Sequence, residues 1–171
     1  MDEKLLQSLA DKQAIYEVLV RYCRGIDRFD MDLVRSSFHP DAIDNHTGYI
    51  GTAEGFFTFV EPHLRSFAGS MHILCNHLSE IDGDVAACET YALAIHWDRE
   101  GQVATRNMTM GFRYVDHMTR RNGLWKIQER WVACEWAKSD LDQTKLKLEG
   151  PVGTRGPDDP LTALRAKLGF G

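Results

Sequence analysis

The sequence predicts an α+β fold in which helices come first along the chain and an antiparallel sheet follows. In the first third of the 171 residues, apolar side chains recur at the spacing of a helix face. The middle third changes to long runs rich in β-forming residues, separated by the turn dipeptides Asp82-Gly83 and Asn122-Gly123. Segregated helices and strands are typical of a sheet that carries helices on one face.

Three helices are expected before the sheet. The first covers residues 9–26, and its apolar face is made by residues at i, i+4, i+7 and i+11, which are Ile15, Leu19, Tyr22 and Ile26. Asp30 can cap a short second helix over residues 31–38. This helix should end before Pro40, because the residue that precedes a proline avoids helical geometry.

A brief strand and a third helix are expected next. The strand covers residues 42–46, and Thr52 can cap the helix that follows. Phe56 and Phe59 mark the apolar face of this helix. Pro62 predicts either a kink or a later start of the helix.

The sheet should contain about four long antiparallel strands, which are residues 71–81, 85–97, 102–118 and 124–136. In the last of them the odd positions are apolar and the even positions are polar. This alternation predicts that Trp125, Ile127 and Trp131 share one face.

The end of the chain differs from the rest. Residues 137–171 are polar and carry Gly-Pro pairs, which is typical of a loop or tail, and residues 161–168 fit a short amphipathic helix. The predicted organisation is therefore one domain over residues 1–136 and a C-terminal extension over residues 137–171.

Composition excludes several function classes. Twenty Lys plus Arg against 25 Asp plus Glu give a net charge of −5, which lacks the basic character of a nucleic-acid or membrane-surface binder. We find no signal peptide and no apolar run long enough to span a membrane. The four cysteines form no Cys-x-x-Cys pair and are expected to be reduced thiols of a cytoplasmic protein.

Motifs for common chemistries are also missing. The sequence has no nucleophile elbow, no phosphate-binding glycine loop and no His-Glu-x-x-His zinc motif. His72 and His77 are five residues apart and would face opposite sides of a regular strand. No metal and no other cofactor is expected.

Three residues are candidates for chemistry. His72 opens an apolar strand, with Leu74 and Leu78 on its own face, and should look into the space between sheet and helices. Asp27 follows the first helix, where a carboxylate opposes the helix dipole. Tyr22 lies on the core face, and its hydroxyl should need a partner. The plainer alternatives are a structural core histidine and a solvated carboxylate.

The positions of the other histidines predict their surroundings. His39, His46 and His63 fall in or near loops or on a helix surface, and solvated side chains are expected there. His96 and His117 lie toward strand ends, from which they can reach a cavity or solvent.

Four segments carry a resemblance to a known family. They are Tyr22-Cys-Arg-Gly-Ile-Asp27, Phe38-His-Pro-Asp-Ala42, Ser70-Met-His72 and Gly123-Leu-Trp-Lys-Ile127. In this order and spacing the chain resembles the SnoaL-like branch of the nuclear-transport-factor-2-like superfamily. The resemblance implies a cone-shaped fold, in which a strongly bent, mostly antiparallel sheet and three N-terminal helices enclose a pocket.

Within this superfamily the chain is most similar to the subgroup of scytalone dehydratase, hexachlorocyclohexane dehydrochlorinase and bile-acid dehydratase. The resemblance implies that His72 and Asp27 form a catalytic dyad and that Tyr22 assists them. Additional polar groups of scytalone dehydratase match only loosely, to His96 or Asn107, and Asn107 is a further candidate to contact the substrate. The further acidic residue of the bile-acid enzyme has no match, because the corresponding stretch reads Ala92-Leu-Ala-Ile95.

The resemblance implies a cofactor-independent, dehydratase-like β-elimination on a small hydrophobic alicyclic or polycyclic substrate. His72 would be the base, and Asp27 would fix its tautomer. Candidates for the pocket wall are Phe29, Phe56, Phe59, Trp97, Met108, Met110, Phe112 and Trp131. A homotrimer or homodimer is implied as well. The alternatives are a non-catalytic hydrophobic-ligand-binding or oxygenase accessory subunit, and a ketosteroid-isomerase-like enzyme, which needs a carboxylate base.

Overall fold

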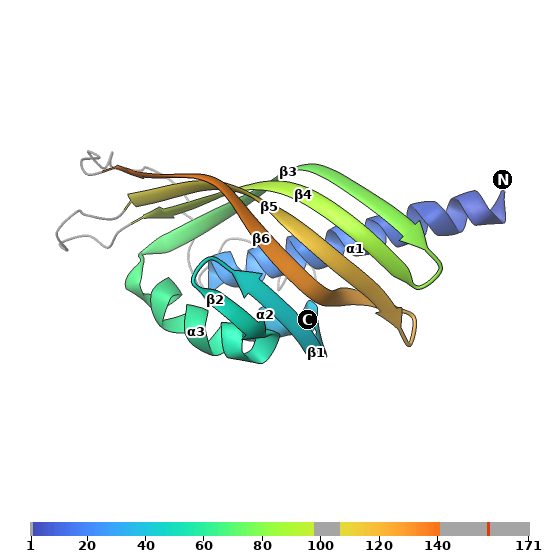
Figure 1. Ribbon diagram of the computed structural model, residues 1–171, viewed down its shortest axis with the longest axis horizontal. Helices are drawn as coiled ribbons and strands as arrows, with labels where there is room; N and C mark the ends of the chain where they lie inside the picture. Colours follow the sequence, from blue (N-terminus) through green and yellow to red (C-terminus); the bar gives the residue numbers. More distant parts are fainter. Residues whose placement is uncertain (1, 98–106, 141–156, 158–171) are drawn as a thin grey trace.

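The computed structural model describes residues 2–97, 107–140 and 157. Its helices and strands, in chain order, are α1 (Glu3–Arg28), α2 (Met31–Ser36), β1 (Phe38–His46), β2 (Tyr49–Thr52), α3 (Ala53–Ser66), β3 (Gly69–Asp82), β4 (Val85–Trp97), β5 (Asn107–Arg121) and β6 (Leu124–Asp140) (Figure 1).

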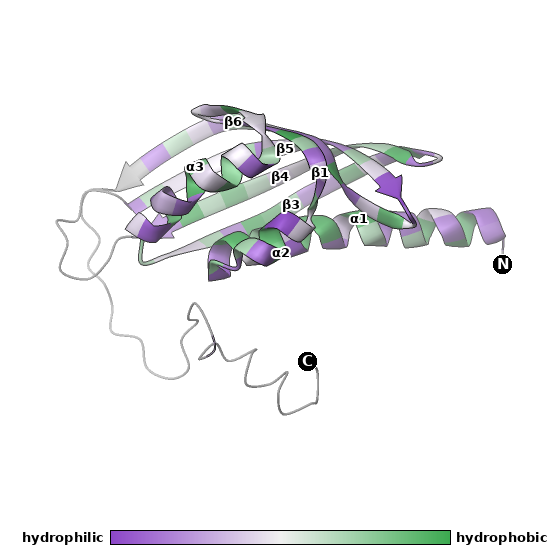
Figure 2. Cartoon of the chain, turned by 90° about the horizontal axis from the view of Figure 1, so that it is seen from below, coloured by the Kyte–Doolittle hydropathy of each residue, from purple (hydrophilic) through white to green (hydrophobic). Residues whose placement is uncertain are grey.

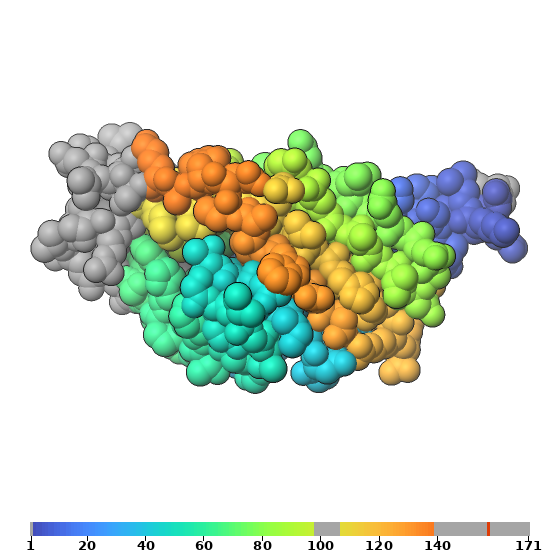
Figure 3. Space-filling model, in the orientation of Figure 1, coloured from blue at the N-terminus to red at the C-terminus, as the bar shows by residue number. Residues whose placement is uncertain are grey.

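The six strands form one bent sheet in the order β2-β1-β6-β5-β4-β3. Neighbouring strands are antiparallel except for β1 and β6, which run parallel. The helices lie on one side of this sheet, α1 along β3 and α3 along β1 and β2 (Figure 2). In the space-filling view, the N-terminal part of α1 projects beyond the sheet (Figure 3).

Local chemistry sets the ends of α1 and the turn into α2. The Asp2 side chain caps α1 by accepting a hydrogen bond from the backbone N–H of Lys4, at 3.0 Å. Phe29 ends α1 in the left-handed conformation, with φ of 57°. A Cβ on Gly25 would lie 2.7 Å from Val34 Cγ2, so glycine allows α2 to fold back closely against α1.

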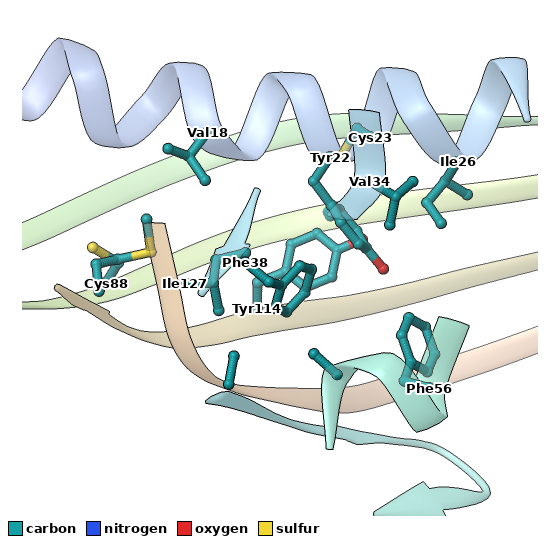
Figure 4. Packing of buried hydrophobic residues seen from close by; sticks show 14 of the residues in the cluster. Val18, Tyr22, Cys23, Ile26, Val34, Phe38, Phe56, Cys88, Tyr114 and Ile127 are labelled. Atoms are coloured by element: carbon teal, nitrogen blue, oxygen red, sulfur yellow. The ribbon is translucent and has the colours of Figure 1, made fainter. Parts of the chain in front are cut away.

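A continuous core fills the space between helices and sheet (Figure 4). It contains an ion pair in which the fully buried Arg130 donates from Nε and Nη2 to the two carboxylate oxygens of Asp116, at 2.7 and 2.9 Å. The Arg130 guanidinium also lies 3.9 Å from the ring centre of Tyr114 and 4.3 Å from that of Tyr22. Two aromatic rings and one carboxylate thus surround a buried cation.

The structure confirms the predicted α+β fold with N-terminal helices and a bent, mostly antiparallel sheet. Several element boundaries differ from the expectation, the second helix ends at Ser36, and the short strand β2 was not predicted. The first helix begins at Glu3, the strand expected over residues 42–46 begins at Phe38, and the last strand continues to Asp140. Pro62 lies within α3, which continues past it. The domain division at residue 136 stays a prediction, and the helix expected over 161–168 lies outside the described residues.

Two irregularities in strand pairing overturn predictions of side-chain direction. The register of β3 against β4 shifts between Leu74 and His77, so His77 faces the helices as His72 does, and Leu78 is 60% exposed on the other face. The register of β6 against β5 shifts between Ile127 and Glu129. Trp131 therefore does not share the face of Ile127 and is 53% exposed.

Candidate active site

A cavity of about 300 Å³ lies between the bent sheet, α1 and α3. This volume is at the lower end of the range for small-molecule sites, which begins at about 300 Å³. Most of the wall is apolar or aromatic. The described residues that line it are Tyr22, Ile26, His46, Thr47, Phe56, Phe59, Val60, His63, Leu64, His72, Ala94, His96, Met108, Met110, Phe112, Tyr114 and Val132.

His72 of the predicted pair lines the cavity, and Asp27 contacts it from outside the lining. Asp27 lies in the last turn of α1, and His72 lies near the start of β3, which packs along that helix. Their side chains are joined by a hydrogen bond of 2.6 Å between His72 Nδ1 and Asp27 Oδ1. The two side chains are only 8% and 13% exposed, so this contact is shielded from water.

Two further hydrogen bonds fix the Asp27 carboxylate. The backbone N–H of His72 donates to Oδ2 at 2.9 Å, and the Ser70 hydroxyl donates to Oδ1 at 3.1 Å. Ser70 and His72 are two residues apart on one strand and therefore reach the same face. Because the carboxylate accepts from Nδ1, a neutral His72 carries its hydrogen there and keeps the lone pair on Nε2. This is the tautomer that a general base requires.

Aromatic rings from neighbouring strands hold the His72 imidazole. The His96 ring meets it edge to face, with the centroids 5.6 Å apart, and the Phe112 ring does so at 6.4 Å. The position of His96 toward a strand end predicts a side chain in a cavity or in solvent, and the structure places it in the cavity wall.

Tyr22 lines the cavity from α1 and is 2% exposed. Its ring packs edge to face against Phe38 and Tyr114, at 5.7 Å in both cases (Figure 4). Burial raises the pKa of the Tyr22 phenol well above its ordinary value; the Asp44 charge adds to this rise and Arg130 opposes it. The hydroxyl therefore stays protonated and can donate a hydrogen bond.

A second His–Asp pair lies on β1, which the sequence analysis missed. The structure places His46 in the cavity wall, with Nδ1 hydrogen-bonded to Oδ1 of Asp44. Asp44 is fully buried, and the His46 ring stacks on Phe56 with a centroid distance of 4.0 Å. A solvated His46 was expected because only a brief strand over residues 42–46 was predicted, with His46 at its end. The available signal was the Asp-x-His spacing, which puts both side chains on one face of a strand.

His63 of α3 is exposed, as expected, and also lines the cavity. His39 differs from the expectation of a solvated side chain. His39 is 5% exposed, and its Nε2 hydrogen-bonds to the backbone oxygen of Thr119 at 3.0 Å. His39 therefore belongs to the core rather than to the surface.

Five predicted pocket residues line the cavity, namely Phe56, Phe59, Met108, Met110 and Phe112. Four others do not. Trp131 lies on the outer face because of the register shift in β6, and its Nε1 donates to Glu129 at 3.0 Å. Phe29 ends α1 outside the cavity, with the Arg65 guanidinium 4.3 Å from its ring centre. Trp97 covers Gly69 at the end of β4, and Asn107 pairs with Asp140 at the start of β5.

The described ranges contain no group of three His, Cys, Asp or Glu side chains that could hold a metal ion. None of the helices in these ranges is long and apolar enough to cross a membrane.

Comparison with known proteins identifies the family. The model of the SnoaL-like domain matches residues 7–131, which is most of the chain. The protein belongs to the SnoaL-like family. No curated protein sequence matches it significantly.

Solved structures that share the fold of this chain include proteins named as a dehydratase and a dehydrochlorinase. A putative scytalone dehydratase from Novosphingobium aromaticivorans DSM 12444 is 17% identical, with a TM-score of 0.68 over 85% of this chain and 95% of that chain. A hexachlorocyclohexane dehydrochlorinase from Novosphingobium barchaimii LL02 is 18% identical, with a TM-score of 0.71 over 84% and 99% of the two chains. The Kfla4162 protein from Kribbella flavida is 18% identical, with a TM-score of 0.69 over 77% and 95%. At these identities the likeness shows the fold.

Proposed function

We propose that the protein is a cofactor-independent lyase that carries out a β-elimination on a small hydrophobic alicyclic or polycyclic substrate. The observation that carries this proposal is the shielded hydrogen bond from Asp27 to His72, whose side chain lines a mostly apolar cavity. The names of the dehydratase and the dehydrochlorinase that share the fold support it.

In this reaction His72 Nε2 takes a proton from the carbon next to an activating carbonyl. Asp27 stabilises the imidazolium that forms, because its carboxylate already accepts from Nδ1. Tyr22 donates a hydrogen bond to the substrate carbonyl, on which negative charge develops. The apolar wall provides the binding free energy for the ring of the substrate.

The two alternatives differ in what the cavity must contain. An isomerase of the ketosteroid type needs a carboxylate base in the cavity, whereas the described lining residues include no Asp or Glu. A non-catalytic binding subunit would hold the same ligands without proton transfer, and the experiment below separates it from the lyase.

The test uses exchange of the α-protons of cyclohexanone and of a decalone in D₂O, followed by NMR. Exchange requires only the base and the group that polarises the carbonyl. The wild type should exchange faster than buffer, and His72→Ala should lose about 10²–10⁴-fold of the rate. His117→Ala removes an exposed imidazole of β5 and should leave the rate unchanged. Binding of the ketones without exchange would refute the lyase and favour the binding subunit.

The implied homotrimer or homodimer and the cytoplasmic location stay predictions. The outer face of the sheet has an apolar hollow lined in part by Leu78, Val85, Val115 and Trp131, which would suit contact between copies. Analytical ultracentrifugation of the full chain tests the oligomer.

A further inference from the structure

Two His–Asp pairs reach one cavity from different ends of the sheet. His72 comes from the edge strand β3 and His46 from β1, with β4, β5 and β6 between them. In both pairs the carboxylate contacts Nδ1, so Nε2 is the ring nitrogen that can meet a ligand. The bent sheet therefore presents two imidazoles to a substrate from two sides.

The surroundings of Asp44 distinguish its pair from that of His72. Asp27 accepts hydrogen bonds from a backbone N–H and from Ser70 besides the imidazole. Asp44 is fully buried, and among the described residues its Oδ2 has no hydrogen-bond partner. His46 is thus the group that most directly compensates the buried Asp44 carboxylate.

Arg130 does not take over this role. It is the register partner of Asp44 on the neighbouring strand, but its Nε and Nη2 are both directed to Asp116. This part of the core therefore contains two buried carboxylates, those of Asp44 and Asp116, and one buried guanidinium, that of Arg130. Burial keeps the Tyr22 phenol neutral, so it adds no charge. Among the described side chains, His46 is therefore the basic group that contacts the Asp44 carboxylate.

We propose that His46 is a second catalytic residue, the acid that protonates an oxygen leaving group while His72 removes the proton on carbon. Asp44 acts as the positioning residue for His46. This proposal rests on the proposed lyase function and narrows its substrate class. A hydroxyl leaves as water only when it receives a proton, whereas a halide leaves without one. The second pair therefore assigns the cavity to dehydration rather than to dehydrohalogenation.

The C–H bond next to the carbonyl breaks, its proton moves to His72 Nε2, and its electron pair forms the C=C bond. The C–O bond at the β-carbon breaks, and the oxygen leaves as water with a proton from His46 Nε2. The substrate loses one water, and solvent returns the proton from His72 to His46 after product release.

The experiment compares two leaving groups in one protein. β-Hydroxycyclohexanone and β-chlorocyclohexanone give the same enone, whose absorbance is followed, and only the hydroxyl needs an acid. His46→Gln keeps a hydrogen-bonding side chain but cannot donate a proton at neutral pH. Relative to wild type, it should eliminate the hydroxyl about 10²–10⁴-fold more slowly and the chloride at a similar rate. Because a misfolded variant loses both reactions, the ratio of the two rates reports on the acid alone.

Asp44→Asn tests the positioning role through the pH profile of kcat/KM for the hydroxy ketone. The acidic limb reports the base His72, and the basic limb reports the acid His46. Loss of the Asp44 charge should move the basic limb to lower pH and leave the acidic limb in place. Tyr49 on β2 is the register partner of His46, and Arg130 on β6 is that of Asp44. The other titratable side chains that line the same cavity are Tyr22, His63, His72, His96 and Tyr114.

The outcomes separate the two proposals. If the wild type exchanges α-protons but His46→Gln slows the hydroxyl and the chloride equally, or slows neither, the acid role of His46 is overturned and the lyase stands. Exchange by the wild type without any loss of water from the hydroxy ketone also overturns the acid role. If the wild type catalyses no α-proton exchange, the lyase fails and the role of His46 fails with it.

Discussion

Replacing Asp27 by asparagine keeps the shape of the side chain but turns one acceptor oxygen into a donor. The new NH₂ group can occupy the position of either Oδ2 or Oδ1. In place of Oδ2 it would face the backbone N–H of His72, and two donors would oppose each other. In place of Oδ1 it would donate to His72 Nδ1, which requires the neutral ring to move its hydrogen to Nε2. The ring can shift its proton and the backbone cannot, so the second arrangement is expected.

This arrangement removes the base, because Nε2 then carries a hydrogen instead of a lone pair. Exchange of cyclohexanone α-protons should fall by about 10²–10⁴-fold, as for other general bases. The hydrogen bonds persist with a neutral partner, so the free energy of unfolding in urea should fall by only about 1–2 kcal/mol. The ring-nitrogen NMR shifts of His72 report the tautomer without any substrate.

Ser70→Ala is the matched control for Asp27→Asn. It removes one hydrogen bond to the same carboxylate and leaves the donor at Nδ1 untouched. The tautomer should be unchanged, and the exchange rate should fall by less than about tenfold. The reasoning is refuted if Asp27→Asn keeps the hydrogen of His72 on Nδ1, or if it exchanges protons at the wild-type rate.

Three further predictions concern the core. Asp116→Asn leaves the buried Arg130 charge without its carboxylate partner. The free energy of unfolding in urea should fall by about 3–5 kcal/mol. A loss below about 1 kcal/mol would contradict the ion pair as described. Gly25→Ala forces α2 away from α1, because the new Cβ would lie 2.7 Å from a side-chain carbon of Val34 in α2. The free energy of unfolding in urea should fall by about 1–3 kcal/mol. An unchanged value would mean that the two helices can move apart without cost. Burial raises the pKa of the Cys23 and Cys88 thiols to about 12. At pH 8 a disulfide reagent should therefore label the two exposed cysteines rapidly and the two buried ones only on unfolding. Equal labelling rates for all four would contradict the packing. The buried cysteines are Cys23 and Cys88, and the exposed ones are Cys75 and Cys134.

The sequence was informative where a side chain's direction follows from a regular period. The helical spacing places Tyr22 on the core face of α1, and the start of β3 places His72 toward the helices, as the structure has them. The Asp27–His72 contact itself joins distant parts of the chain, so only the resemblance to a family pointed to it.

The errors have a shared physical cause. A β-bulge adds one residue to a strand and reverses which face every later side chain occupies. Such shifts in β3 and β6 misplaced Leu78 and Trp131, because no residue type at those points marks a bulge. His46 was missed for a related reason. The sequence around it in strand β1 is polar, and the partner strand β6 lies far along the chain, so the local pattern did not predict a buried strand.

The parallel pairing of β1 with β6 has a consequence for the order in which the protein folds. Hairpins such as β3–β4 and β5–β6 join neighbours in the chain and can form as soon as each is synthesised. β1 leaves the ribosome early but has to wait for β6, since its place in the sheet is beside the last strand. Closing such a long loop is entropically unfavourable until other contacts hold the ends together. The part of the sheet that carries His72 should therefore form before β1 with His46 joins it. The cavity is complete only when β1 has paired with β6.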